Sequence, residues 1–188
     1  MSERLDMSEA HFPSEDPSSF WLLDPKLIFL NHGSFGSCPR PVLEFQSRMR
    51  ERLERQPIPF FVSQLESEMD AARAALAAFV GAQPADLVAV PNATSGINTV
   101  LRSLDFQPGD ELVVTNHEYN ACRNALNFVT GRTGATVRVA SIPFPIASPD
   151  LAIDAILNVV TEKTRLVMLD HVTSQTGLVL PLEKIVAT

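Results

Sequence analysis

Three polar side chains, Asn92, Thr94 and Ser95, stand between a short apolar run and a helical pattern, where they could bind an anion. The run at residues 87–90 predicts a short buried strand that ends at Pro91, and the apolar residues that follow recur with helical spacing. The first backbone N–H groups of a helix lack internal partners and the helix dipole is positive there, so a phosphate would be stabilised. The alternative is that Thr94 or Ser95 merely caps the helix.

Polar residues also follow two other predicted strands. A core strand at residues 111–115 leads into His117 and Tyr119, and a strand at residues 165–170 leads into a loop that reaches Gly177. Strands that alternate with helices indicate a parallel sheet with helices on both faces. Because ligands bind outside the carboxyl ends of the strands in such sheets, the polar segments are expected to open onto one edge. The predicted fold class is therefore α/β with a mostly parallel sheet.

Hydrophobic periodicity and turn residues assign the remaining elements. Further strands are predicted at residues 27–30 and 136–142, and helices at residues 42–55, 63–81, 97–104, 120–132 and 150–160, with a last one that begins at Pro181. The helix at 63–81 is predicted to start with a capping box of Ser63 and Glu66 and to end at Gly81. Its buried stripe is expected to comprise Leu65, Met69, Ala72, Leu76 and Phe79. Residues 1–25 are expected to form an N-terminal arm.

Composition limits the classes of partner. The 188 residues are 45% hydrophobic, which suffices for a sizeable core, and the formal net charge of −7 argues against nucleic acid and anionic membrane surfaces. The first 16 residues contain no apolar run and therefore predict neither a secretory signal nor a membrane anchor, so a cytoplasmic location is expected. Cys38 and Cys122 are predicted to be reduced thiols.

Several common site motifs are absent from the sequence. No Gly-x-Gly-x-x-Gly follows a strand, no Gly-Lys-Ser/Thr follows a glycine-rich loop, and no Gly-x-Ser-x-Gly occurs. These absences weaken a dinucleotide site and argue against a P-loop NTPase and a nucleophile elbow. The four histidines never occur at metal-ligand spacing, so no metal site is predicted; they are His11, His32, His117 and His171.

Four segments share their order and spacing with one enzyme family. They read Asn-His-Gly-Ser-Phe-Gly at 31–36, Asn-Ala-Thr-Ser-Gly-Ile-Asn at 92–98, Asn-His-Glu-Tyr-Asn-Ala at 116–121 and Asp-His-Val-Thr-Ser-Gln-Thr-Gly at 170–177. This pattern resembles the class V aminotransferase family of pyridoxal phosphate (PLP) enzymes, in particular its isopenicillin-N-epimerase-like branch. The resemblance implies fold type I, with residues 26–188 forming the N-terminal part of the large cofactor domain.

The resemblance also implies roles for individual residues. Ala93 and Thr94 match the positions that hold the PLP phosphate, and Ser95, a side-chain donor at the same helix start, is assigned to the same site. His117 matches the residue that stacks on the pyridine ring in related cysteine desulfurases, with Tyr119 as a substitute. Ser174 stands where relatives place an Asn near the ring hydroxyl of PLP, and a serine hydroxyl can donate the same hydrogen bond with a shorter reach. The substrate-side loop of the family corresponds to Asn31, His32, Gly33 and Ser34.

Two groups that PLP chemistry requires match no position in the chain. The Schiff-base Lys and the Asp that pairs with the pyridinium nitrogen are expected beyond Thr188, so no catalytic residue is assigned here and the chain is expected to be truncated. Asp170 matches a position one strand too early and is interpreted as a loop-orienting carboxylate. Lys163 and Lys184 match no catalytic site.

The expected parent is a homodimeric PLP enzyme that acts on a small amino acid by epimerisation, transamination or carbon–sulfur cleavage. All three reactions begin with the same external aldimine, so the four segments do not choose among them. The chain alone is expected to be inactive. The alternative is a non-catalytic doubly wound domain that binds another phosphorylated small molecule.

Overall fold

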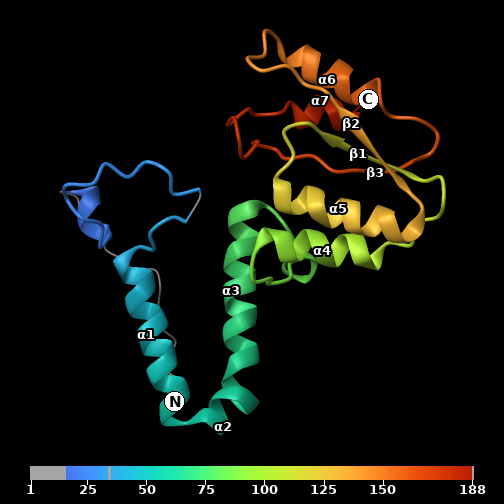
Figure 1. The fold of residues 1–188 in the computed structure, drawn as a ribbon. Helices are drawn as coiled ribbons and strands as arrows, with labels where there is room; N and C mark the ends of the chain where they lie inside the picture. The colour runs from blue at the N-terminus through green and yellow to red at the C-terminus, as the bar shows by residue number, and fades with distance from the viewer. Residues whose placement is uncertain (1–15, 34, 188) are drawn as a thin grey trace. The chain divides into compact units, whose positions relative to one another are not determined.

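The structure is a computed structural model that describes residues 16–33 and 35–187, and these residues form two compact units (Figure 1). The first unit ends at Val88 and the second begins at Ala89. The boundary expected near residue 25 stays a prediction. No helix in the described part of the chain is both long and apolar enough to cross a membrane.

The first unit is helical. In chain order its elements are η2 (Pro17–Phe20), α1 (Arg40–Arg55), α2 (Pro57–Pro59), the π-helical turn η3 (Phe60–Gln64), α3 (Leu65–Val80) and η4 (Pro84–Asp86). Helix α3 ends as predicted at Gly81, whose φ of 71° lies in the left-handed region that glycine adopts without strain. Periodicity and the stop signal therefore located both long helices well.

Three details predicted for the first unit are wrong. Residues 27–30 form no strand, and Ile28 and Leu30 are 86% and 87% exposed, because an apolar run without a paired neighbour has no ladder to join. Ser63 lies inside η3 and caps no helix, since the backbone is already helical before α3 begins. The expected stripe on α3 is not buried: Phe79 is 88% exposed.

The second unit contains the sheet. Its elements are α4 (Ala93–Ser103), β1 (Glu111–Thr115), α5 (Asn120–Thr133), β2 (Thr136–Ala140), α6 (Pro149–Leu157), β3 (Thr164–Val167) and α7 (Leu182–Ala187). The strand order is β2-β1-β3, and both pairings are parallel, with Leu112 of β1 opposite Val137 of β2 and Leu166 of β3. The α/β class with a parallel sheet is confirmed.

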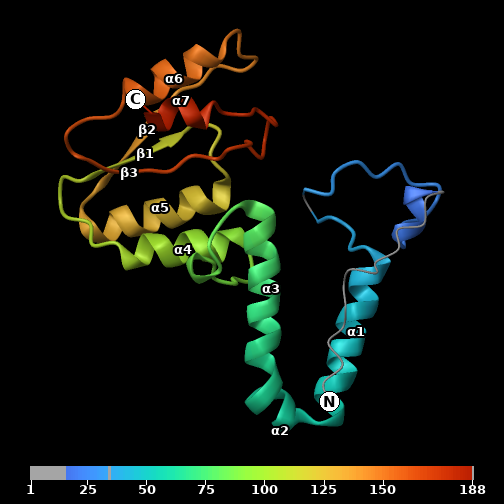
Figure 2. The same ribbon diagram turned by 180° about the vertical axis from the view of Figure 1, so that it is seen from behind.

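Strand β1 is the centre of the second unit. Four consecutive residues, from Leu112 to Thr115, are at most 2% exposed because β1 has a hydrogen-bonded strand on each side and helices on both faces. Helices α4 and α5 cover one face, and α6 and α7 cover the other (Figures 1 and 2). Leu126 of α5 and Ile156 of α6 are each at most 1% exposed in the two core clusters. This packing fixes the carboxyl end of β1, where the polar segments begin.

The strand predicted at residues 87–90 is not formed. Val88 is 82% exposed and Val90 is 47% exposed, and the three-stranded sheet does not include them. Four apolar residues are compatible with a strand, but a strand also needs a partner that completes its hydrogen bonds. The helix start that follows is nevertheless present at Ala93.

Candidate functional site

His117 lies two residues beyond β1 and is only 5% exposed. Its backbone N–H donates to Oγ1 of Thr115 at 3.1 Å, which turns the chain at the carboxyl end of the strand. Its ring stands edge-on to the ring of Phe144, with the centroids 6.1 Å apart. The histidine is therefore a buried group at the edge where ligands bind in parallel sheets.

The preceding residue, Asn116, joins the ends of β1 and β2. Its side-chain Nδ2 donates to the carbonyl of Ile142 at 3.1 Å, and its Oδ1 accepts from the N–H of the same residue at 2.8 Å. Both polar backbone groups of Ile142 are thus engaged by one amide side chain. The arrangement fixes the backbone against which His117 is placed.

The ring of His117 is held at both nitrogens. Nε2 lies 3.0 Å from the carbonyl oxygen of Ile142, and Nδ1 lies 3.2 Å from Oγ1 of Thr176. The second contact joins residues 59 positions apart and brings the loop after β3 to the end of β1. The structure therefore places His117 beside the loop that carries Ser174, as the sequence predicted for the two segments.

The loop after β3 is held together by hydrogen bonds between its own residues. Val172 and Val179 form an antiparallel bridge, and the N–H of Leu178 donates to Oγ1 of Thr173 at 2.9 Å. Thr173 is 2% exposed, whereas Ser174 is exposed and its hydroxyl makes no hydrogen bond within the described residues. The Ser174 hydroxyl is thus available to a ligand.

The carboxyl groups of Asp170 and of Glu118, which follows His117 in the chain, interact electrostatically. The backbone N–H of Tyr119 donates to Oε1 of Glu118 at 3.0 Å, while Oε2 of Glu118 and Oδ2 of Asp170 are buried without a partner among the described residues. Burial raises the pKa of Glu118 to about 7, and the charge of Asp170 adds to the rise. Burial also raises the pKa of Asp170, which the Tyr119 N–H partly opposes. The loop-orienting role expected of Asp170 stays a prediction.

The start of α4 offers free hydrogen-bond donors. Asn92 is the N-cap, and its Oδ1 accepts from the N–H of Ser95 at 2.8 Å, so neither Thr94 nor Ser95 has the capping role considered above. The backbone N–H groups of Ala93 and Thr94, and the hydroxyls of Thr94 and Ser95, make no hydrogen bond within the described residues. These four donors at the positive end of a helix suit a phosphate.

The two parts of the site lie at one end of the second unit. Helices α4 and α5 lie side by side and run in the same direction (Figures 1 and 2). Near the end of α4, Cζ of Arg102 lies 4.9 Å from the ring centroid of Phe128 in α5. Because α5 begins directly after the turn that contains His117, the start of α4 is also at the carboxyl end of β1. The expectation that these segments share one edge agrees with this topology.

The expected substrate loop belongs to the first unit. Asn31, His32 and Gly33 are exposed, and the His32 ring lies edge-on to Phe29 with centroids 4.8 Å apart. Ser34 falls outside the described residues. The role of this loop stays a prediction.

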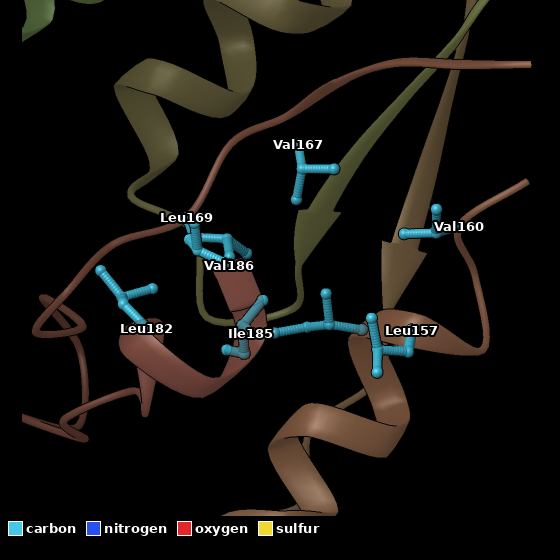
Figure 3. A pocket seen from close by; sticks show the side chains of 8 residues that line it. Leu157, Val160, Val167, Leu169, Leu182, Ile185 and Val186 are labelled. Atoms are coloured by element: carbon cyan, nitrogen blue, oxygen red, sulfur yellow. The ribbon is translucent and has the colours of Figure 1, made fainter. Parts of the chain in front are cut away.

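An apolar cavity of about 520 Å³ lies between α6, α7 and β3 (Figure 3). Aliphatic side chains alone line it, namely Ile156, Leu157, Val160, Val167, Leu169, Leu182, Ile185 and Val186. Without a polar or titratable group it provides no chemistry. Within the described residues no cluster of three metal-ligating side chains occurs either.

Sequence reasoning assigned no role to four residues of this site. They are Asn116, Glu118, Thr173 and Thr176, all inside segments already noted for their family pattern. A local pattern gave no signal for them, since their partners are distant in sequence: Asn116 binds Ile142, and Thr176 binds His117.

Comparison with known proteins places the chain in one family. The sequence profile of the class V aminotransferases matches residues 44–188. The chain is 36% identical over 162 residues to isopenicillin N epimerase of Amycolatopsis lactamdurans, covering 85% of the chain and 40% of that protein. It is 26% identical to L-cysteine desulfhydrase of Arabidopsis thaliana, covering 84% of the chain and 38% of that protein. The chain therefore spans about two fifths of the length of these relatives.

A solved structure shows the same fold. A mutant of C-DES with glycine covalently linked to its PLP cofactor is 29% identical, with a TM-score of 0.79 over 92% of this chain and 45% of that chain. C-DES in complex with cysteine persulfide, described as a cystine C-S lyase, has a TM-score of 0.77. The fold type I assignment is confirmed by these neighbours.

Proposed function

The chain belongs to the class V aminotransferase family, and from this membership we propose that it is the N-terminal part of a PLP-dependent enzyme that acts on an amino acid. The observation that carries the proposal is the set of free donors at the start of α4, at the same end of the unit as His117. Two backbone N–H groups and two hydroxyls fit the phosphate of PLP. The cofactor, when bound, supplies an electron sink for negative charge on the substrate carbon.

Each proposed binding residue has a separate task. The N–H groups of Ala93 and Thr94 and the hydroxyls of Thr94 and Ser95 bind the phosphate. The flat ring of His117 stacks on the pyridine ring and holds it in plane, and the Ser174 hydroxyl donates to the ring oxygen. Residues 31–34 provide the substrate side of the site in the whole protein.

The reaction type is proposed only as a class. Relatives named as an epimerase and as a cysteine desulfhydrase both match the chain, so epimerisation, transamination and carbon–sulfur cleavage all remain candidates. We further propose that the 188-residue chain is inactive alone, because Lys26, Lys163 and Lys184 match no catalytic position of the family. A homodimer and a cytoplasmic location are predictions for the whole protein.

A titration of the purified chain with PLP tests the proposal. We expect reversible binding that inorganic phosphate competes with, and about tenfold weaker binding for each of Thr94→Val and Ser95→Ala, since each removes a hydrogen bond to a charged oxygen. Thr99→Val is the matched control, because its hydroxyl already donates to the carbonyl of Ser95 inside α4. Binding that is unchanged in both site variants would contradict the phosphate assignment.

A second measurement separates an enzyme from a binding module. The whole protein should show the yellow absorbance of lysine-bound PLP, and borohydride should bleach it. If other phosphorylated small molecules bind and PLP does not, the non-catalytic alternative is correct.

A further inference from the structure

The direction of the hydrogen bonds around His117 shows where its proton lies. A carbonyl oxygen only accepts, so the 3.0 Å contact between Nε2 and the oxygen of Ile142 requires a proton on Nε2. The same oxygen accepts from Nδ2 of Asn116, whose own orientation is fixed because its Oδ1 accepts from the N–H of Ile142. The Nε2–H form of the ring is therefore imposed by the backbone at the end of β2.

The second ring nitrogen lies at the end of a row of hydrogen bonds that runs through the hydroxyls of Thr176 and Thr173. In the neutral Nε2–H ring, Nδ1 has a lone pair and accepts from the hydroxyl of Thr176 at 3.2 Å. Thr176 then accepts from the hydroxyl of Thr173, which lies 2.8 Å away. Thr173 in turn accepts from the N–H of Leu178 at 2.9 Å. Every donor in this row has an acceptor, and every bond points toward His117.

A doubly protonated ring would leave one hydroxyl of this row without an acceptor. Nδ1 would donate to Thr176, and if Thr176 then donated to Thr173, the Thr173 proton would have no acceptor among the described residues, although that side chain is only 2% exposed. If Thr176 instead accepted from both Nδ1 and Thr173, its own proton would lose the acceptor that Nδ1 provides in the neutral ring. A buried hydroxyl without an acceptor is unfavourable, so the row favours the neutral ring.

We propose that Thr176, oriented by Thr173, is a positioning residue that holds His117 as a neutral imidazole with its proton on Nε2. Both nitrogens are then engaged by protein groups, so neither is free to bind a ligand. If the proposed function is correct, on which this consequence rests, His117 contributes a stacking surface and does not transfer a proton.

The row also explains why the loop after β3 must keep its shape. Thr173 and Thr176 are held by the turn in which the N–H of Gly177 donates to the carbonyl of Thr173 at 2.9 Å. Gly177 has a φ of 64°, a conformation that other residues adopt only with strain. The orientation of one imidazole thus depends on the ends of β1 and β2 and on the loop after β3.

Nuclear magnetic resonance of the ¹⁵N-labelled chain without cofactor tests the proposal directly. Long-range proton–nitrogen spectra at pH 7.5 should show the His117 ring with a proton on Nε2 and with Nδ1 accepting a hydrogen bond. Thr176→Val should shift the Nδ1 signal to that of an unbonded nitrogen, and Thr176→Ser should restore it. Thr130→Val is the matched control, since it removes a buried hydroxyl that donates to Leu126 inside α5.

The wild-type spectrum alone can overturn the proposal. A proton on Nδ1, or on both nitrogens, would do so whether or not the variants fold, and an unchanged Nδ1 signal in folded Thr176→Val would do so as well. PLP titrations of the same samples keep the two ideas apart. The expected ring form without PLP binding would contradict only the proposed function, while PLP binding with a proton on Nδ1 would contradict only this inference.

Discussion

The two compact units of the chain differ in how much of their apolar surface they bury. Among the described residues, the first unit has only two buried apolar side chains, Phe60 and Ala77, although its long helices carry apolar faces. The second unit has two core clusters, one on each face of the sheet. Amphipathic spacing is thus enough to predict a helix, but it does not tell what covers the apolar face of that helix.

The strongest test of this comparison deletes the same side chain in each unit. Leu112→Ala should lower the free energy of unfolding by about 2–5 kcal/mol, because Leu112 is fully buried in β1 and its loss leaves a cavity. Leu76→Ala in α3 should change it by about 0.5 kcal/mol or less, since Leu76 is 52% exposed. Urea unfolding followed by circular dichroism measures both. Equal losses would mean that the first unit buries its helices as well as the second.

The pH dependence of stability should come from the second unit. The pKa of Glu118 rises from 4.5 to about 7 on folding, so the folded state binds this proton more tightly than the unfolded state. The stabilisation by protonated Glu118 is therefore complete below about pH 4.5 and is lost as the pH rises to about 7. Over this range the free energy of unfolding should fall by up to about 3 kcal/mol. Urea unfolding at pH 5.5 and 7.5 should show higher stability at the lower pH.

Two variants make the pH experiment specific. Glu118→Gln keeps an oxygen for the Tyr119 N–H and removes the titrating group, so the difference between the two pH values should shrink. Glu66→Gln in the first turn of α3 removes an exposed carboxylate of the first unit and should leave the difference in place. A difference that survives in Glu118→Gln would show that another group causes it.

The sequence was a good guide where one element determines its own structure. The helices α1, α5 and α6 and the strand β1 were predicted within a few residues, because periodicity, glycine stops and a run of buried apolar residues are local signals. The strand predicted at 87–90 failed because pairing is not local. For the same reason the contact of Thr176 with His117 had no signal in the sequence.

A third test concerns a polar contact between α1 and α3 in the first unit. In α1, a guanidinium nitrogen of Arg52 lies 2.6 Å from Oε1 of Glu68 in α3. Cζ of Arg52 also lies over the ring of Phe60, 5.6 Å from its centroid. Arg52→Met should keep most of the packing and lose the charge-assisted bonds, at a cost of about 1–2 kcal/mol. Hydrogen exchange of α1 amides should become faster, while that of β1 stays unchanged. Faster exchange in β1 would mean that the units do not open independently.

The smallest expected effect compares a real helix cap with a predicted one. Asn92 is the N-cap of α4, where its Oδ1 accepts from the N–H of Ser95, whereas Ser63 lies inside the π-helical turn before α3. Asn92→Ala should therefore cost about 1 kcal/mol of stability, and Ser63→Ala should be neutral within about 0.5 kcal/mol. The segments that begin at Asn92 and at Ser63 both resemble helix starts, since each has a possible capping residue followed by a helical pattern.

The difference between them lies in the backbone before the helix. Asn92 is extended, with a φ of −165° and a ψ of 168°, so its side chain can reach back to the first turn. The residues before α3 are already helical, and their N–H groups have partners within the preceding turn, so a serine hydroxyl there has no free N–H to accept from. Urea unfolding of both variants, with the wild type as reference, decides between the two readings. A loss in Ser63→Ala as large as that in Asn92→Ala would mean that α3 begins at Ser63 and that the capping box forms after all.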